Sequence, residues 1–130
     1  MGARVLIVED NGLLALELAR AVGAGGFNVV GPARTAANAL KLIGREGCDA
    51  AVLDVHLGNE TSERVALELR KLKTPFLVVS AYFSDQMPPA FGDALALRKP
   101  VCPRLLISGL IKCLEHPRCL MPSEGLQFSV

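Results

Sequence analysis

The sequence has no strong excess of charge of either sign. Its 14 Lys and Arg residues nearly balance its 13 Asp and Glu residues, and the formal net charge is +1. Proteins that bind nucleic acids or anionic membranes through a basic face carry a clear surplus of positive charge. We therefore expect no nucleic-acid partner and no binding to a membrane surface.

Long apolar runs are also missing, although 51% of the residues are hydrophobic. No run approaches the roughly 20 apolar residues that cross a bilayer as a helix. No secretory signal precedes the first apolar segment, so we expect a soluble, cytoplasmic protein. A chain of 130 residues suits one domain. We expect this domain over residues 1–117, followed by a C-terminal tail over 118–130 that shows no periodicity.

The sequence lacks the paired Cys-x-x-Cys motifs that bind zinc. Its cysteines are scattered, at Cys48, Cys102, Cys113 and Cys119. Free cysteine commonly serves as a small apolar residue in protein cores. We therefore expect reduced thiols without a specific role.

Short apolar runs alternate with helical patterns along the chain. Uninterrupted runs predict buried parallel strands over residues 4–9, 27–31, 50–54, 75–80 and 95–98. Amphipathic spacing predicts helices over about 13–22, 36–43, 62–72 and 103–115. Asn11 is a candidate N-cap of the first helix.

The segment between the fourth and fifth runs breaks this pattern. Met87, Pro88 and Pro89 would interrupt a helix, and only residues 90–94 remain before the next run. We expect the fourth helix to be short or disordered. The overall alternation predicts a doubly wound α/β fold, with a five-stranded parallel sheet, right-handed crossovers and helices on both faces.

Polar residues lie at the carboxyl ends of four of the five predicted strands. Glu9 and Asp10 lie at the end of the first, Asp54 ends the third, Ser80 ends the fourth and Lys99 follows the fifth. Sheets of this kind build their sites at the carboxyl ends of the strands. We therefore expect these side chains to lie close together.

Three carboxylates at one place would repel one another without a positive charge among them. Mg²⁺ prefers oxygen ligands, keeps several waters and commonly bridges carboxylates to phosphate. An anion on Asp54 would be neutralised by such an ion, by the Lys99 ammonium and by the Ser80 hydroxyl. The set predicts phosphoryl transfer to a carboxylate, where positioning and charge neutralisation supply most of the catalysis.

These residues give the chain a resemblance to the receiver domains of two-component response regulators, over roughly residues 3–115. Receiver domains carry an acidic pair after the first strand and an acceptor aspartate after the third. They also carry Ser or Thr after the fourth strand and Lys-Pro after the fifth, and this chain has all of these in the same order. The resemblance implies a flavodoxin-like (βα)5 fold in a stand-alone signalling domain.

The resemblance also implies roles for the acidic residues. Asp54 would accept a phosphoryl group from a histidine kinase or a histidine phosphotransfer protein. Asp10, Asp54 and the backbone carbonyl of His56 would bind Mg²⁺, and Glu9 would hold the metal through water.

The remaining roles follow from the same resemblance. Lys99 would contact a phosphoryl oxygen, and Ser80 would hydrogen-bond another once Asp54 is modified. The peptide bond before Pro100 is often cis in this family. Such a domain is no enzyme beyond phosphorylation and slow dephosphorylation of its own Asp54. It would signal by binding an unknown downstream protein, as a monomer or weak dimer.

The chain departs from the receiver pattern in several places. Ala96 stands where most receivers have the Tyr or Phe that moves inward on activation. Residues 75–81 resemble the Pro-Phe-x-Phe-Ala-Thr-Gly stretch of a receiver subgroup whose fourth helix is disordered. We expect phosphorylation to order or shift residues 81–94. His56 and Tyr82 would border the path of the hydrolytic water, and their bulk predicts slow dephosphorylation, although the imidazole could instead assist the water.

Two other functions fit the expected fold less well. An aspartyl-phosphate phosphatase or transferase of the haloacid-dehalogenase kind needs a second aspartate two residues after its nucleophile, where this chain has His56. A flavodoxin-like cofactor binder needs a phosphate-binding loop after the first strand, where this chain has Glu9 and Asp10.

Overall fold

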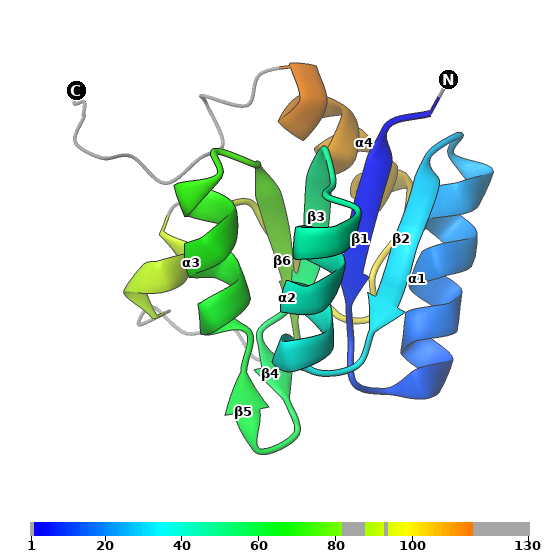
Figure 1. The fold of residues 1–130 in the computed structure, drawn as a ribbon. Coiled ribbons are helices and arrows are strands. Elements are labelled where there is room, and N and C mark those ends of the chain that lie inside the picture. Colours follow the sequence, from blue (N-terminus) through cyan, green and yellow to red (C-terminus); the bar gives the residue numbers. More distant parts are fainter. Residues whose placement is uncertain (1, 82–87, 93, 116–130) are drawn as a thin grey trace, which may run out of the picture.

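A computed structural model describes residues 2–81, 88–92 and 94–115 of the chain (Figure 1). The predictions for Tyr82, Cys119 and the tail over residues 118–130 lie outside these residues. The domain boundary at residue 117 therefore stays a prediction. In the part of the chain described, no helix is long and apolar enough to cross a membrane.

The predicted parallel sheet is confirmed. Its strands are β1 (Arg4–Val8), β2 (Asn28–Ala33), β3 (Ala50–Asp54), β6 (Phe76–Ser80) and β7 (Ala96–Arg98). They lie in the order β2-β1-β3-β6-β7, and every neighbouring pair is parallel. The chain moves outward in one direction from β1 to β2 and in the other from β3 to β7. A doubly wound sheet of this order has its switch point between β1 and β3.

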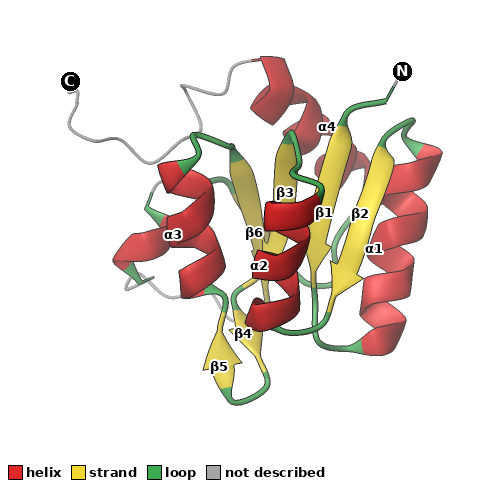
Figure 2. Cartoon of the chain, in the orientation of Figure 1, coloured by secondary structure: helices red, strands yellow, loops and turns green. Residues whose placement is uncertain are grey.

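Helices cover both faces of the sheet, as the alternation predicts. They are α1 (Gly12–Ala24), α2 (Ala36–Arg45), α3 (Glu63–Lys71), α4 (Pro103–Glu115) and the short 3-10 helix η1 (Pro89–Phe91). Figure 2 shows α2 and α3 in front of the sheet. The helices α1 and α4 pack against each other and against the opposite face.

The sheet separates two hydrophobic cores. Side chains alternate between the faces along a strand, so neighbouring residues of β1 enter different cores. Leu6 and Val8 pack with α2, α3 and η1, whereas Val5 and Ile7 pack with α1 and α4. The strands β3 and β6 are buried along their whole length. This burial on both faces explains why the sequence shows continuous apolar runs.

Side-chain caps begin the first two helices. The carboxamide oxygen of Asn11 accepts a hydrogen bond from the backbone N–H of Leu14 at 3.0 Å, which confirms the predicted N-cap. The hydroxyl of Thr35 accepts in the same way from Asn38 at 3.1 Å. Each cap satisfies a backbone donor that the first turn of a helix leaves free.

Strand β2 runs two residues beyond the predicted end at Gly31. The pairing with β1 shifts between Leu6 and Val8, so that Val8 pairs with Ala33. Gly31 has a φ of 93°, a conformation that glycine adopts readily. This local irregularity lets the strand continue where the sequence pattern stops.

The loop after β3 contains a β-hairpin that the apolar pattern does not predict. Its strands, β4 (His56–Leu57) and β5 (Glu60–Thr61), pair antiparallel around Gly58 and Asn59. Figure 1 shows the hairpin projecting at the end of the molecule where the sheet strands terminate. Between β6 and β7 the described residues contain only η1, in agreement with the expected short fourth helix.

Candidate functional site

The ends of β1 and β3 bring the acidic residues together at the switch point of the sheet. These strands are direct neighbours, and Val8 pairs with Leu53, one residue before Asp54. The backbone N–H of Glu9 donates to the carbonyl of Ala33 at 2.9 Å, which fixes the turn after β1. Ligand atoms of Glu9, Asp10 and Asp54 all lie within 4.8 Å of one another.

Lys99 lies between two of these carboxylates. Its Nζ is 2.9 Å from Asp54 Oδ2, to which it donates a hydrogen bond, and 3.0 Å from Glu9 Oε1. The Lys99 side chain is 17% exposed, whereas that of Glu9 is fully buried. The predicted site residues Glu9, Asp10, Asp54 and Lys99 therefore meet at one place.

Burial favours the neutral form of Glu9. It raises the pKa of this carboxyl to about 7, although Lys99 and the N–H of Asn11, which donates to Oε2 at 3.1 Å, act in the opposite direction. Oε1 is buried, and the Lys99 ammonium lies 3.0 Å from it.

The ionised form of Lys99 is favoured. Partial burial acts to lower its pKa, but the hydrogen bond to Asp54 and the contact with Glu9 outweigh it, and the pKa is raised above the usual value. A permanent cation therefore faces Asp54.

The three acids can hold a metal ion. Two of them are buried and Asp10 is half-buried, so a cation could bind from the solvent side while the oxygens stay shielded. Lys99 is the cation that contacts Glu9 and Asp54 among the described residues, and it supplies a single positive charge beside the three acids. An all-oxygen donor set with room for water fits a hard divalent cation such as Mg²⁺.

Ser80 ends the strand beside Asp54. Strands β3 and β6 are neighbours, and Asp54 pairs with Val79, so Ser80 lies one residue further toward the carboxyl edge. Its side chain is 1% exposed, and its backbone carbonyl accepts a hydrogen bond from the N–H of Lys99 at 2.9 Å. The peptide bond between Lys99 and Pro100 is cis.

His56 begins the β4–β5 hairpin, two residues after Asp54. Its side chain is exposed. The metal-binding role of its backbone carbonyl and its effect on phosphoryl lifetime both stay predictions. Ala96 is half-buried in β7, at the position where an aromatic side chain is usual in receivers.

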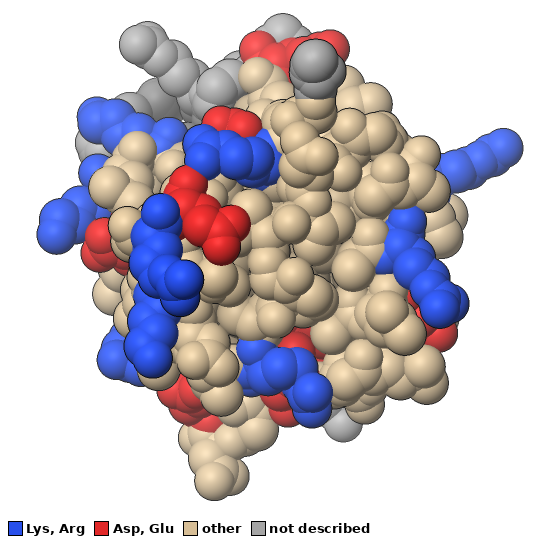
Figure 3. Space-filling model, turned by 45° about the vertical axis from the view of Figure 1, so that its right-hand side comes forward, with Lys and Arg blue, Asp and Glu red and all other residues tan. Residues whose placement is uncertain are grey.

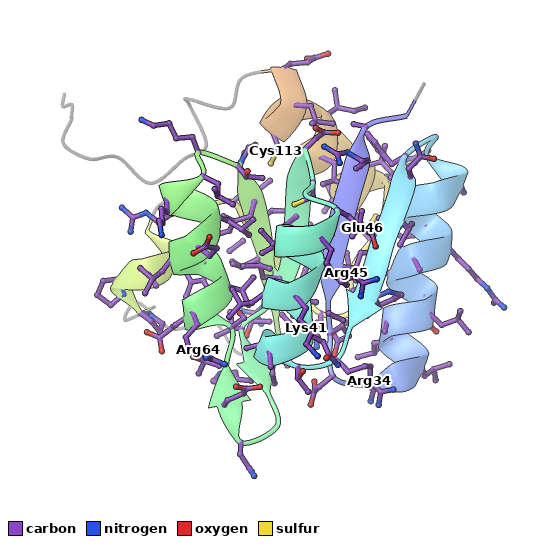
Figure 4. The ribbon with its side chains drawn as sticks, viewed as in Figure 1. Arg34, Lys41, Arg45, Glu46, Arg64 and Cys113 are labelled. Atoms are coloured by element: carbon purple, nitrogen blue, oxygen red, sulfur yellow. The ribbon has the colours of Figure 1, made fainter. Side chains whose placement is uncertain are left out.

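Three residues at the site are absent from the sequence-based prediction. Arg34 donates from Nε to the carbonyl of Asp10 at 2.7 Å and lies at the hairpin end of the molecule (Figure 4). Gly58, in the hairpin turn, is so close that a Cβ there would lie 3.8 Å from Asp10 Oδ2. The buried Ser62 hydroxyl donates to the backbone carbonyl of Asp54. The Gly-Asn pair at 58 and 59 is a recognised hairpin signal, but nothing local marks Arg34 or Ser62.

A cavity of about 320 Å³ extends from the site between α1 and the start of α4. Glu9 and Lys99 line it at one end, and apolar residues such as Leu14, Leu18 and Leu106 line the rest. The site is therefore next to an apolar hollow on the α1 side of the molecule.

Sequence comparisons with known proteins find two regulators that are similar to this chain. No protein-family model matches the chain. It is 32% identical over 85 residues to the phyllosphere-induced regulator PhyR of Methylorubrum extorquens, covering 63% of this chain and 32% of PhyR. It is 29% identical over 113 residues to the transcriptional regulatory protein PdtaR of Mycobacterium tuberculosis, covering 86% of this chain and 55% of PdtaR. The alignments thus span about a third and about half of these relatives.

The fold is similar to that of solved receiver-domain structures. A CheY-like response regulator receiver domain protein from Methanospirillum hungatei superposes with a TM-score of 0.80, at 24% identity, over 92% of this chain and 98% of that one. The sheet order and the residues at the strand ends agree with this similarity. The chain therefore has the CheY-like receiver fold, and its sequence is similar to parts of the regulators PhyR and PdtaR.

Proposed function

We propose that Asp54 accepts a phosphoryl group from a histidine kinase or a histidine phosphotransfer protein, with Mg²⁺ bound by Asp10 and Asp54 and held through water by Glu9. The modified domain then signals by binding another protein in the cytoplasm. The observation that supports this most strongly is the position of the Lys99 ammonium, 2.9 Å from Asp54 Oδ2 beside the cluster of three acids. Receiver domains are signalling proteins rather than enzymes in the ordinary sense.

The proposed reaction is an in-line displacement. A carboxylate oxygen of Asp54 attacks the phosphorus of a phosphohistidine, and an O–P bond forms as the N–P bond breaks. The donor imidazole keeps the electron pair and takes up a proton. Mg²⁺, when bound, supplies charge neutralisation for the phosphoryl oxygens. The backbone carbonyl of His56 completes the proposed protein ligands of the metal.

Lys99 and Ser80 stabilise the product in this proposal. Lys99 leaves its hydrogen bond to Asp54 and binds a phosphoryl oxygen, while it stays anchored to Ser80 through the backbone bond of 2.9 Å. The hydroxyl of Ser80, which ends the neighbouring strand, hydrogen-bonds a second phosphoryl oxygen. Both movements take place within two adjacent strand ends, β6 and β7.

The surface beside the site suits a protein donor. Leu13 and Leu16 on α1 are 68% and 48% exposed, and the same helix contributes Leu14 and Leu18 to the cavity that reaches Glu9 and Lys99. Figure 3 brings the α1 side forward and shows an uncharged area in the middle of the view, with charged side chains around it. We expect the donor to dock over α1, because exposed leucines on the helix beside a reactive group favour protein contact.

The output is proposed to be a protein contact made by a monomer or a weak dimer. PhyR from another organism is described as an anti-anti-sigma factor, and PdtaR as a transcriptional regulatory protein. Because Ala96 replaces the usual aromatic switch residue, we expect the signal to leave through residues 81–94 instead.

The proposal is tested by incubating the full chain with acetyl phosphate and Mg²⁺ and measuring its intact mass. We expect one added phosphoryl group that requires Mg²⁺ and is lost in Asp54→Asn. The matched control is Asp49→Asn, since Asp49 lies on the exposed surface and pairs with Arg4. No Mg²⁺-dependent adduct on the unsubstituted chain would overturn the proposed function.

A further inference from the structure

Ser62 holds the two peptide units that follow the acceptor aspartate. Its side chain is fully buried, and its hydroxyl donates to the backbone carbonyl of Asp54 at 2.6 Å. Its backbone N–H donates to the carbonyl of Val55 at 3.0 Å. The N–H of Val55 in turn donates to the carbonyl of Val79 at 3.2 Å. Ser62 thus binds the backbone carbonyls of both Asp54 and Val55, the two residues that precede His56.

The hydroxyl of Ser62 is diverted from its usual role in a helix. Ser62 is the N-cap residue of α3, but its side chain makes no capping hydrogen bond. Asn11 and Thr35 hold the same position in α1 and α2, and both accept a hydrogen bond from the third residue after them. Serine at this position ordinarily does the same.

The Thr61 side chain binds one of the free backbone donors at the start of α3. Its hydroxyl accepts from the backbone N–H of Glu63 at 3.3 Å and donates to Glu63 Oε1 at 2.9 Å. The helix therefore begins without help from the Ser62 side chain, and that side chain is available to the strand end that carries Asp54.

We propose that Ser62 is a positioning residue for the phosphoryl site. By fixing the peptides after Asp54, it sets the orientation of the Asp54 carboxylate and of the His56 carbonyl toward the metal. Loss of the buried hydrogen bond from Ser62 would leave the carbonyl of Asp54 without this donor, which costs free energy. The bond therefore holds the peptide after Asp54 in one orientation. The inference rests on the proposed function, because it concerns the same metal and the same acceptor.

Loss of this hydroxyl leaves the hairpin attached elsewhere. Glu60 Oε2 accepts from the backbone N–H of Ala36 at 3.1 Å and so ties β5 to the start of α2. The strand pairing of β4 with β5 also remains. We therefore expect removal of the hydroxyl to disturb the peptides around Val55 without unfolding the loop.

The test compares Ser62→Ala and Ser62→Gly with the unsubstituted full chain. Both variants lack the hydroxyl and keep the N–H that binds Val55, and glycine is well tolerated at an N-cap. The control is Thr35→Ala, which removes a helix-capping hydroxyl outside the proposed machinery. The measurements are Mg²⁺ affinity from amide shifts, the rate of adduct formation with acetyl phosphate, and stability in urea.

We expect both Ser62 variants to bind Mg²⁺ about fivefold or more weakly, the change that corresponds to losing one hydrogen bond. Adduct formation should slow in parallel, and Thr35→Ala should lose stability but keep the Mg²⁺ affinity. If both variants bind Mg²⁺ within about twofold of the unsubstituted chain, the positioning role of Ser62 is overturned, and the proposed function of Asp54 is not affected. Failure of the unsubstituted chain to bind Mg²⁺ would overturn the proposed function, and this inference with it.

Discussion

At the scale of single residues, Glu9 is the side chain whose environment differs most from that of an exposed acid. It is fully buried beside Lys99 and Asp54, and its pKa is raised to about 7 chiefly by burial. Such a group weakens the folded state when it is ionised. A bound cation would remove this penalty, since it stabilises the charged form.

The pH dependence of stability follows from this shift. Below about pH 4.5, the ordinary value, Glu9 is protonated in both the folded and the unfolded chain. As the pH rises toward 7, unfolding releases its proton, so the free energy of unfolding of the metal-free protein should fall by roughly 3 kcal/mol at most. Glu9→Gln should flatten this decline, and so should saturating Mg²⁺ on the unsubstituted chain.

The check is urea unfolding between pH 4.5 and pH 8 without Mg²⁺, followed by circular dichroism. Glu17→Gln on α1 is the matched control, because Glu17 is exposed and should leave the slope unchanged. If the free energy of unfolding falls with pH equally in Glu9→Gln and in the unsubstituted chain, burial of Glu9 is not the cause of the fall.

At the scale of elements, the β4–β5 hairpin is the part that gives the site its form beyond the strand ends. Ser62, which follows the hairpin and begins α3, donates a hydrogen bond to the backbone carbonyl of Asp54. Glu60 in the hairpin accepts a hydrogen bond from the first residue of α2. Its turn needs Gly58 at a φ of 66°, a left-handed conformation that other residues adopt only with strain. A Cβ at this position would meet only an ordinary contact with Asp10, so the strain is in the backbone.

Two glycine substitutions should therefore act in opposite directions. Gly58→Ala should destabilise the protein by about 1 kcal/mol, because alanine is strained at positive φ. Gly44→Ala should stabilise it by roughly 0.5–1 kcal/mol, because Gly44 lies inside α2 with open space where a Cβ would be. Urea unfolding measures both, and a Gly58→Ala variant as stable as the unsubstituted chain would rule out this account of the turn.

At the scale of the whole molecule, the sheet and its two cores could be predicted from the sequence and much of the site's support could not. Buried strands appear in the sequence as continuous apolar runs, such as residues 50–54. The polar residues that follow these runs predict the cluster of Glu9, Asp10 and Asp54. Strands of two residues are too short to show a period, so the hairpin was missed. The bond from Ser62 to Asp54 and the burial of Glu9 depend on tertiary packing, which no local pattern encodes.

The proposed route of the signal also belongs to the whole molecule. Phe91 in η1 is buried, and η1 packs on α3, the helix whose N-cap is Ser62. We expect beryllofluoride with Mg²⁺ to slow amide hydrogen exchange across residues 81–94. Asp54→Asn should show no such response, and unchanged exchange in the unsubstituted chain, once the mimic is shown to bind, would refute this route.

In the proposed reaction Asp54 carries the phosphoryl group. Reduction of an aspartyl phosphate with borohydride converts that aspartate to homoserine, which peptide mass spectrometry locates in the chain. After treatment with acetyl phosphate and Mg²⁺, the account predicts homoserine at position 54 alone, and none when Mg²⁺ is omitted. Homoserine at another aspartate, or at none, would contradict it.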